Sequence, residues 1–507
     1  MELKQLTDET LKLFDVPDTS NLSEKMLEIE LNNDFSYYAK FKELVDDLSV
    51  DWLQKIFQYY EADRKEKMQD YTPRSLAKFV GRLTQNENEK IVFDLCAGSG
   101  ALTIQKWNLN HNLEFICYEY DEKVIPFLLF NLAVRNINAT VIHGNALSDE
   151  VFATYKVTST SDFSRIAKVD AVDIVCDTAI SNPPYNMKWI EPPFAQLQSR
   201  FANCEIPPES NANYAFILTA LDKVKYRAAM ILPNAVLSTD IRQEKEIRKY
   251  LIESNYVESV ILCPDKMFEA TSIATCILVL SKTKTTRNIA FVDMRQQYTV
   301  EQREQNGQYG GASHTNRTYK KDIKTFSDEQ IDKAIQCIHE HIDEAEYSRT
   351  VQIDEIREND YILVPSRYID FENREYKHRD FADIMNDINR IEREKSVLKL
   401  TLNESLAKSL GFDKELYNQE ENTAKELNKS FELVGGKYEF RKYITFSKNK
   451  NEFKIENQDK EILSSILKMV LPMWKQHIYY LNEEQNRLLA EFRDALLPEL
   501  MSGNIEV

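Results

Sequence analysis

The chain has 507 residues, 43% hydrophobic and 29% charged, a balance typical of globular proteins and a length typical of about three domains. No apolar run is long enough for a membrane span and the N-terminus is charged, which argues against a secretory signal peptide, so we expect a cytoplasmic protein without a membrane partner. The formal net charge of −18 argues against a chain that binds nucleic acid on its own, because phosphate contacts come from clustered Lys and Arg, and favours a partner that provides most of them.

The first segment of the chain has the periodicity of helices. In residues 41–60 apolar side chains recur at spacings of three and four, which places many of them on one helix face. We therefore predict an N-terminal helical region over residues 1–68. The triplet Tyr71-Thr72-Pro73 follows and opens a further helical segment. Thr72 can cap that helix, or Tyr71 and Thr72 can mark a helix N-terminus whose amides bind a carboxylate; the sequence leaves both interpretations open.

From about residue 90 to residue 293, within the domain expected over residues 69–300, short β-branched apolar runs alternate with helical segments. Such runs are hydrophobic on both faces, which is typical of a mostly parallel sheet covered on both sides. The fold class predicted is therefore a doubly wound α/β domain. The expected strands are residues 91–95, 114–118, 140–143, 177–181, 228–232, 257–263, 274–280 and 289–293.

The seven cysteines of the chain are scattered and include no CxxC pair. Several lie in the apolar runs of the expected strands, where cysteine behaves as a small buried hydrophobic residue. The sequence thus predicts reduced thiols and neither structural zinc nor any other metal site.

A glycine-rich turn, Asp94-Leu95-Cys96-Ala97-Gly98-Ser99-Gly100, ends the first expected strand and precedes a helix. Glycines at such a turn let the backbone approach a ligand closely, because a Cβ would clash. The turn lacks the GxGxxG pattern of dinucleotide sites, and Asp94 stands four residues before its first glycine. These features favour S-adenosylmethionine as the cofactor, with Cys96, Gly98, Ser99 and Gly100 forming the turn around it and Asp94 facing its ammonium.

Two polar residues at later strand ends complete the expected cofactor site. Glu119 ends the next strand, 25 positions after Asp94, and its carboxylate can accept both ribose hydroxyl protons. The alternative is a surface glutamate in a strand-to-helix loop. Asn145 ends the third strand, where its side chain can hydrogen-bond the edge of the cofactor's adenine ring.

The segment Asn182-Pro183-Pro184-Tyr185 follows the fourth expected strand, so it shares the carboxyl edge of the sheet with the cofactor turn. The Asn182 side-chain oxygen and the Pro183 carbonyl can each accept a hydrogen from an aromatic amino group, which frees the nitrogen lone pair for attack on a methyl group. Pro183 and Pro184 fix the backbone, and Tyr185 offers a ring on which a base can stack. An ordinary turn is the alternative. We predict these residues as the catalytic group.

The remainder of the chain divides into two expected regions. Residues 301–380 form a loop and connecting region, in which the polar stretch 303–317 is expected to be an exposed loop or domain joint. Residues 381–507 form a C-terminal helical region with amphipathic stretches at 381–410 and 459–503, the second broken or kinked at Pro472 and Pro498. These helices either pack on their own domain or dock a partner.

In their order, the tyrosine-threonine-proline triplet, the glycine-rich turn and the Asn-Pro-Pro-Tyr segment resemble the γ-type amino-methyltransferases. Residues 68–300, and the segment 361–370, are similar to the methylation subunits of type I restriction-modification systems. The resemblance implies N6 methylation of a flipped-out adenine in double-stranded DNA and a seven-stranded sheet with one antiparallel edge hairpin. It also implies a partner DNA specificity subunit, two methylation subunits in the complex, and a possible restriction endonuclease subunit.

The sequence departs from that family at several places. Asn213 stands where the family usually has Asp, and Asn145 stands where it has an acidic residue. The region before the triplet is shorter than usual, and residues 487–505 are more similar to a helix end of specificity subunits. Three alternatives stay open: a protein glutamine N5 methyltransferase, although those chains are much shorter; an RNA adenine methyltransferase, although no RNA-binding motif is evident; and a non-catalytic scaffold with the same fold.

Overall fold

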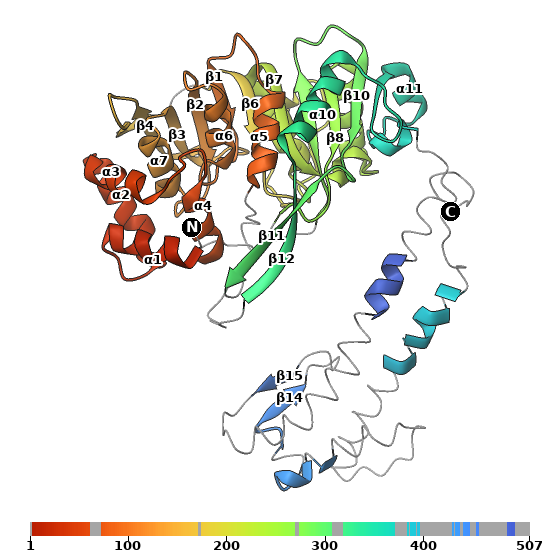
Figure 1. Cartoon of the computed structure of the whole chain (residues 1–507). Helices are drawn as coiled ribbons and strands as arrows, with labels where there is room; N and C mark the ends of the chain where they lie inside the picture. Colours follow the sequence, from red (N-terminus) through yellow and green to blue (C-terminus); the bar gives the residue numbers. More distant parts are fainter. Residues whose placement is uncertain are drawn as a thin grey trace. The chain divides into compact units, whose positions relative to one another are not determined.

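The computed structural model describes residues 3–60, 72–170, 174–268, 273–306 and 318–370, and beyond these only short stretches (383–384, 386–391, 393–395, 428–429, 431–436, 440–446, 453–455 and 484–491). The chain divides into two compact units, Met1–Glu372 and Asn373–Val507. The first unit contains the sheet and the helices around it (Figure 1). The boundaries expected at residues 68, 300 and 380 remain predictions.

The chain begins with the predicted helices, α1 (Leu3–Phe14), α2 (Leu22–Asn32), α3 (Phe35–Leu44) and α4 (Trp52–Tyr60). Asp34 caps α3, because its carboxylate accepts a hydrogen bond from the Ser36 amide at 3.1 Å. The helices pack on α7 (Ile125–Val134) through aromatic rings: Phe130 makes edge contacts with Tyr38 and Phe41 at centroid distances of 4.9 and 5.2 Å. The N-terminal helices are therefore joined to the sheet by a shared core.

Every predicted strand is present. They are β1 (Ile91–Asp94), β2 (Glu114–Glu119), β3 (Asn138–Asn145), β6 (Cys176–Ser181), β7 (Val224–Pro233), β8 (Val257–Leu262), β9 (Thr275–Ser281) and β10 (Asn288–Asp293). Strands β3, β2, β1, β6 and β7 are neighbours in that order and run parallel. The doubly wound α/β fold is confirmed.

Helices cover both faces of this sheet. Val92 and Phe93 are consecutive residues of β1 and belong to separate apolar cores, as the alternation of a strand requires. One core includes α5 (Arg74–Leu83), α7 and α10 (Asp328–Glu340), and the other includes α8 (Asn213–Lys223), α9 (Arg242–Glu253) and α11 (Ile353–Glu358). Helix α6 (Ala101–Leu109) is the next element after β1 and is joined to it by the glycine-rich turn.

The sheet is wider than the resemblance implies. In the described part of the chain it has eleven strands, in the order β13-β10-β8-β9-β7-β6-β1-β2-β3-β4-β5. Strands β4 (Glu150–Thr158) and β5 (Arg165–Val169) extend one edge, and β13 (Ser348–Gln352) extends the other. The antiparallel strand β9 lies between β7 and β8, so the expected hairpin is inside the sheet.

The stretch 303–317 is only partly the loop that its composition suggested. Residues 303–306 belong to β11 (Thr299–Asn306), which pairs antiparallel with β12 (Thr318–Thr325). Figure 1 shows this hairpin projecting beyond the sheet. Polar residues pair here because antiparallel strands can satisfy their backbone groups without burying a side-chain face. Residues 307–317 lie outside the described part.

The second unit is described only in pieces. It contains a two-stranded antiparallel sheet of β14 (Ile444–Phe446) and β15 (Phe453–Ile455). Ile384, Ile388 and Ile391 form a small core with Leu488, so the helical residues around 383–395 and 484–491 pack on each other within this unit. Pro472, Pro498 and most of the segment 487–505 lie outside the described residues.

The seven cysteines are unpaired, and five of them are buried, as the sequence predicts. None of the helices that the structure describes combines the length and the apolar character needed to cross a bilayer.

Glu30 is a buried acidic residue among the N-terminal helices. It lies on α2 with no exposed surface, and burial raises the pKa of its carboxyl well above the ordinary value. The contribution of such a group to stability is present below its unfolded-state pKa and is lost as the pH rises through the folded-state value. Glu30 therefore makes the first unit less stable in alkaline solution.

We expect Glu30→Gln to increase the free energy of unfolding at pH 8 by about 1–3 kcal/mol. The amide cannot ionise, so the unfolded state no longer gains stability by losing a proton at this position. The gain should shrink towards pH 5. Urea denaturation at both pH values measures it, with the exposed Glu43→Gln on α3 as the control. A loss of stability at pH 8 would contradict the prediction.

Candidate active site

Polar side chains gather at the carboxyl ends of the central parallel strands. Strand β1 pairs with β2 on one side and with β6 on the other, and Asp94 lies opposite Cys117 and Ile180 in the two registers. The turn after Asp94 and the turn that begins at Asn182 are therefore at neighbouring strand tips. This is the crevice in which open α/β sheets bind ligands.

The glycine-rich turn is fixed by its own backbone. Gly98 and Gly100 have φ angles of 55° and 100°, a conformation that L side chains rarely adopt. A Cβ on Gly100 would also approach the Leu128 side chain to 3.1 Å. The Ala97 amide donates to the Tyr118 carbonyl at 2.9 Å, which ties the turn to β2. Gly100 is therefore required by conformation, whereas the φ of Gly98 is one that other residues of this chain also adopt.

Asp94 is fully buried at the end of β1. Its Oδ2 accepts a hydrogen bond from the Thr103 hydroxyl at 2.7 Å, while Oδ1 is buried without a hydrogen-bond partner among the described residues. Burial, with the nearby Glu119 carboxylate, raises the pKa of Asp94 to about 7. A buried oxygen of this kind can accept a hydrogen bond from a ligand.

Glu119, at the end of β2, is part of the same cradle. Its Oε2 accepts from the Gly98 amide at 2.8 Å and its Oε1 accepts from the Asp121 amide at 2.7 Å. Burial raises the pKa of Glu119 to about 7. Each carboxylate oxygen has two lone pairs, so each retains one for a ligand hydroxyl. These contacts favour a built site over an exposed loop carboxylate.

The Asn-Pro-Pro-Tyr turn is held by two side-chain hydrogen bonds. The Tyr185 hydroxyl donates to Asn182 Oδ1 at 2.6 Å, and Asn182 Nδ2 donates to the Thr72 hydroxyl at 3.0 Å. The Tyr185 ring meets Phe268 edge-on, with centroids 6.0 Å apart. The amide of Asn182 is thus oriented from both ends.

Asn213 explains one departure from the family pattern. It is fully buried at the start of α8, and its Oδ1 accepts from the Asn186 amide nitrogen of the backbone at 3.2 Å. Its Nδ2 donates to the Asn186 side-chain oxygen at 3.1 Å. An aspartate could not donate the second bond and would instead accept from the NH2 of a turned Asn186 amide. Asn213 thereby anchors the residue that follows Tyr185.

The structure corrects one interpretation of Thr72. Pro73 is the N-cap of α5 and no side chain caps this helix, so Thr72 is not the cap. Its hydroxyl is used by Asn182 instead, and its carbonyl accepts from Gln54 Nε2 at 3.3 Å. Tyr71 lies outside the described residues.

The remaining predicted residues are at the same edge, with different uses of their side chains. The Ser99 hydroxyl donates to Asp51 Oδ2 at 2.6 Å and is buried, so it is directed to the protein interior. Cys96 is half-buried, and burial raises the pKa of its thiol well above the ordinary value. Asn145 Oδ1 accepts from the Leu147 amide at 3.0 Å. Pro183 is buried and Pro184 half-buried.

Sequence reasoning missed two residues of this region. Phe268 contacts Tyr185 from the segment after β8, and a lone phenylalanine beyond a strand carries no distinctive signal. Asp51 contacts Ser99 from the loop before α4. Its position at a helix start predicts only a cap, a role it also has, since its Oδ1 accepts from the Gln54 amide at 2.9 Å.

The doubly wound sheet, its buried acidic cradle and the adjoining Asn-Pro-Pro-Tyr turn together define the class of amino-group methyltransferases. Within that class, the family model described as N-6 DNA Methylase matches residues 46–377, more than half of the sequence. The chain belongs to the N-6 DNA methylase family.

Individual relatives agree with the resemblance seen in the sequence. The chain is 26% identical over 365 residues to the type I restriction enzyme MpnII methylase subunit of Mycoplasma pneumoniae, which covers 66% of this chain and 62% of the relative. It is 23% identical over 399 residues to the MjaVIII methylase subunit of Methanocaldococcus jannaschii, covering 76% and 64%. The chain thus spans less than two thirds of the length of these relatives.

Solved structures include a similar chain, the type I restriction-modification system methyltransferase subunit from Streptococcus thermophilus. It has 22% sequence identity and a TM-score of 0.49, and the match covers 59% of each chain. The likeness to methylation subunits of type I systems, first indicated by the sequence motifs, is confirmed by the family and by the named relatives.

Proposed function

We propose that the chain transfers a methyl group from S-adenosylmethionine to the N6 amino group of an adenine in double-stranded DNA, as the methylation subunit of a type I restriction-modification complex. The observation that carries this proposal is the direct pairing of β1 with β6. It brings the turn after Asp94 and the turn at Asn182 to adjacent strand tips. A methyl donor over one turn and an amino group on the other are then neighbours.

The residues around the glycine-rich turn fit S-adenosylmethionine. The unpartnered Oδ1 of Asp94 suits the cofactor's ammonium, and the remaining lone pairs of Glu119 suit the two ribose hydroxyls. Gly98 and Gly100 leave room for a close backbone approach. We assign the other contacts to the backbone of Cys96 and Ser99, to Tyr71 and Thr72 at the carboxylate end, and to Asn145 at the adenine edge.

Catalysis by the second turn depends on position and hydrogen bonding. S-adenosylmethionine, when bound, supplies a methyl group already activated by a positive sulfur. The adenine N6 is a poor nucleophile because its lone pair is delocalised into the ring. Asn182 Oδ1 and the Pro183 carbonyl each accept one N6 hydrogen and direct the lone pair outward, while Pro184 restricts the backbone. No strong base is required.

The target base must leave the duplex, because its amino group is stacked inside the helix. Tyr185 offers a ring face to the flipped-out adenine. The edge contact with Phe268 and the hydrogen bond to Asn182 fix the orientation of that ring. The same tyrosine therefore links base stacking to the orientation of the catalytic amide.

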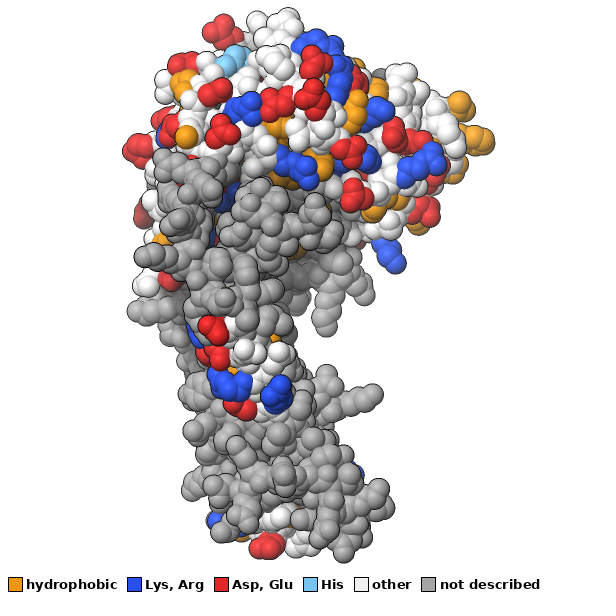
Figure 2. Space-filling model, turned by 90° about the vertical axis from the view of Figure 1, so that its right-hand side faces the viewer, with side chains coloured by type: hydrophobic (Ala, Val, Ile, Leu, Met, Phe, Trp, Pro, Cys, Tyr) orange, Lys and Arg blue, Asp and Glu red, His pale blue; other side chains and the backbone are white. Residues whose placement is uncertain are grey.

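Partners follow from the charge of the chain and from its relatives. On the face in Figure 2, described Lys and Arg side chains are interspersed with Asp and Glu and form no continuous basic band. With a net charge of −18, this supports a DNA specificity subunit that makes most of the DNA contacts. We propose that two methylation subunits join one such partner, that residues 381–507 dock it, and that a restriction endonuclease subunit can associate.

The proposed function is tested by mapping methylated bases. Genomic DNA from cells with the gene and from cells without it is sequenced with a method that detects N6-methyladenine. We expect methylated adenines within one recurring sequence, which disappear with the gene. Identical methylation in both strains would overturn the proposal.

Purified alone, the chain should bind duplex DNA weakly and lose most of that binding between 50 and 200 mM salt, because only phosphate contacts hold it. Adding the specificity subunit should strengthen binding to duplexes that contain the recurring target sequence by at least about tenfold. Fluorescence anisotropy with matched and scrambled duplexes measures both values. Tight, sequence-specific binding by the lone chain would contradict the proposal that the specificity subunit makes most of the DNA contacts.

A further inference from the structure

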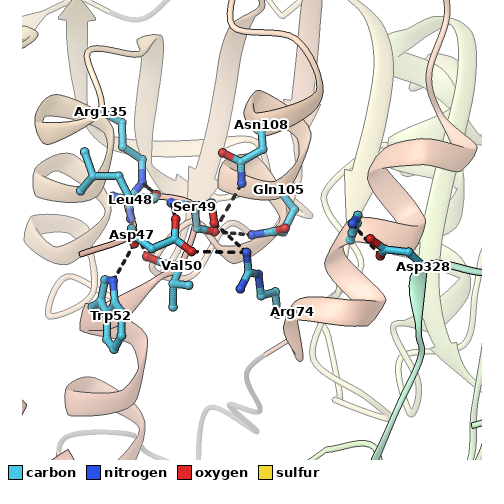
Figure 3. A network of polar contacts seen from close by, with 11 residues as sticks. Asp47, Leu48, Ser49, Val50, Trp52, Arg74, Gln105, Asn108, Arg135 and Asp328 are labelled. Carbon is cyan, nitrogen blue, oxygen red and sulfur yellow. Dashed lines mark hydrogen bonds and ion pairs between the residues drawn. The ribbon is translucent and has the colours of Figure 1, made fainter. Parts of the chain in front are cut away.

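The loop of residues 45–51, between α3 and α4, is bound to helices of the sheet by its backbone. Arg135, at the end of α7, donates from Nε to the Leu48 carbonyl at 2.6 Å and from Nη2 to the Val50 carbonyl at 2.7 Å. Gln105 Nε2 of α6 donates to the Ser49 carbonyl at 2.6 Å. Figure 3 shows these side chains converging on the loop from several elements. These bonds hold the backbone of the loop through residues 48–50.

Asp51 ends this loop, and its buried carboxylate is directed at the cofactor turn. Oδ2 accepts from the Ser99 hydroxyl at 2.6 Å, and Oδ1 accepts from Asn131 Nδ2 at 2.8 Å. Asn131 Nδ2 also donates to the Ser99 carbonyl at 2.8 Å. Both the side chain and the carbonyl of Ser99 are thus held by one small network.

The position of Ser99 gives this network its importance. It stands between Gly98 and Gly100, the two left-handed glycines of the turn. Glycine has more conformations to lose than any other residue, so a turn with two of them needs an outside restraint to stay in one geometry. The network is the restraint at the residue between them.

We propose that Asp51 is a positioning residue of the methyltransfer site: it holds Ser99, and through Ser99 it keeps the glycine-rich turn in the shape that binds the methyl donor. This inference rests on the proposed function. The Ser99 hydroxyl then stabilises the shape of the turn, and the loop 45–51 is part of the cofactor site.

The test is the dissociation constant of the full-length chain for S-adenosylmethionine, measured by isothermal titration calorimetry. Asp51→Ala removes the bonds to Ser99, Asn131 and the Gln54 amide, of which the Ser99 bond acts directly on the turn, and should raise the constant about tenfold. Asp51→Asn should stay within about twofold of wild type, because its amide can accept from Asn131 and donate to the Ser99 oxygen. At saturating donor, the methylation rate of Asp51→Ala should remain within about threefold of wild type.

Asp177→Ala is the matched control. Asp177 is also a buried aspartate, and its Oδ2 accepts from the Lys90 and Ile91 amides at 2.8 and 3.0 Å, at the other end of β1. Its loss should lower the melting temperature without changing donor affinity. Equal weakening by Asp51→Ala and Asp177→Ala would show general destabilisation and overturn the inference.

Ser99→Ala keeps the test decisive if Asp51→Ala does not fold. It removes the same hydrogen bond from the other side and should also raise the dissociation constant, without adding to the effect of Asp51→Ala where both fold. Wild-type affinity in Ser99→Ala would overturn the inference. Failure of the wild-type chain to bind S-adenosylmethionine would instead overturn the proposed function.

Discussion

Asn182→Ala should reduce the rate of methyl transfer by about 100- to 1000-fold, the effect typical of removing one hydrogen-bonding group that acts in the transition state. Asn182 hydrogen-bonds Thr72 and Tyr185, and in the proposed mechanism it acts on the base and not on the donor. Affinity for S-adenosylmethionine should therefore change by less than about twofold. Transfer of labelled methyl groups to duplex DNA by the reconstituted complex, beside calorimetry of donor binding, measures the two effects separately.

Two substitutions of Tyr185 separate orientation from stacking. Tyr185→Phe removes only the hydroxyl that donates to Asn182 Oδ1, so it should slow transfer by about tenfold. Tyr185→Ala also removes the ring and should slow transfer as much as Asn182→Ala. It should also reduce the fluorescence signal of an extruded 2-aminopurine at the target base.

For Asn182→Ala, parallel losses of donor affinity and activity would contradict the proposal that the Asn-Pro-Pro-Tyr turn binds the base and not the donor.

The central part of the fold could be predicted because its signals are local. Strands such as β1 and β9 are short runs rich in apolar and β-branched residues, a pattern typical of strands buried on both faces. The order of motifs then placed Asp94, Glu119 and Asn182 at strand ends. Since parallel strands share one carboxyl edge, the site followed from the fold class.

The edges of the sheet could not be predicted in the same way. Strand β4 carries exposed residues at its first positions and alternating polar ones beyond them, and β5 is mostly exposed. Strand β5 is the edge strand and β4 lies next to it, and strands at a solvent-exposed edge need little apolar surface because water can pair with their outer backbone groups. The hairpin of β11 and β12 is polar for the same reason, and its composition indicated a loop.

Side-chain contacts between distant segments were also beyond the sequence. Thr72 could serve as a helix cap or as a ligand contact by its local pattern, whereas its hydroxyl accepts from a residue 110 positions away. Asp51 and Ser99 are 48 positions apart and meet only because α6 and α7 fix the loop between α3 and α4. Such pairs depend on packing, which no short pattern encodes.

Glu119→Ala should raise the dissociation constant for S-adenosylmethionine by about 100-fold or more. Hydrogen bonds to a charged group contribute about 1.5–3 kcal/mol each, and two ribose hydroxyls would lose their acceptor. The Gly98 amide would also lose its partner, which loosens the turn. The exposed Glu122→Gln in the same loop is the control and should bind like wild type. Unchanged affinity in Glu119→Ala would remove this residue from the cofactor site.

The pH dependence of binding tests the same carboxylate without truncating it. Burial raises the pKa of Glu119 to about 7, so in the free protein the contribution of this group to stability is present below its unfolded-state value and is lost as the pH rises through 7. Donor binding has the opposite sign, because the ionised form accepts both ribose hydroxyls and balances the positive charge of the ligand. Affinity of the wild type should therefore increase between pH 6 and pH 8.

In Glu119→Gln the increase should be smaller and should retain only the part due to Asp94, whose pKa is also raised to about 7. Calorimetry across this range distinguishes the two proteins, and equal slopes would show that Glu119 does not titrate with the ligand.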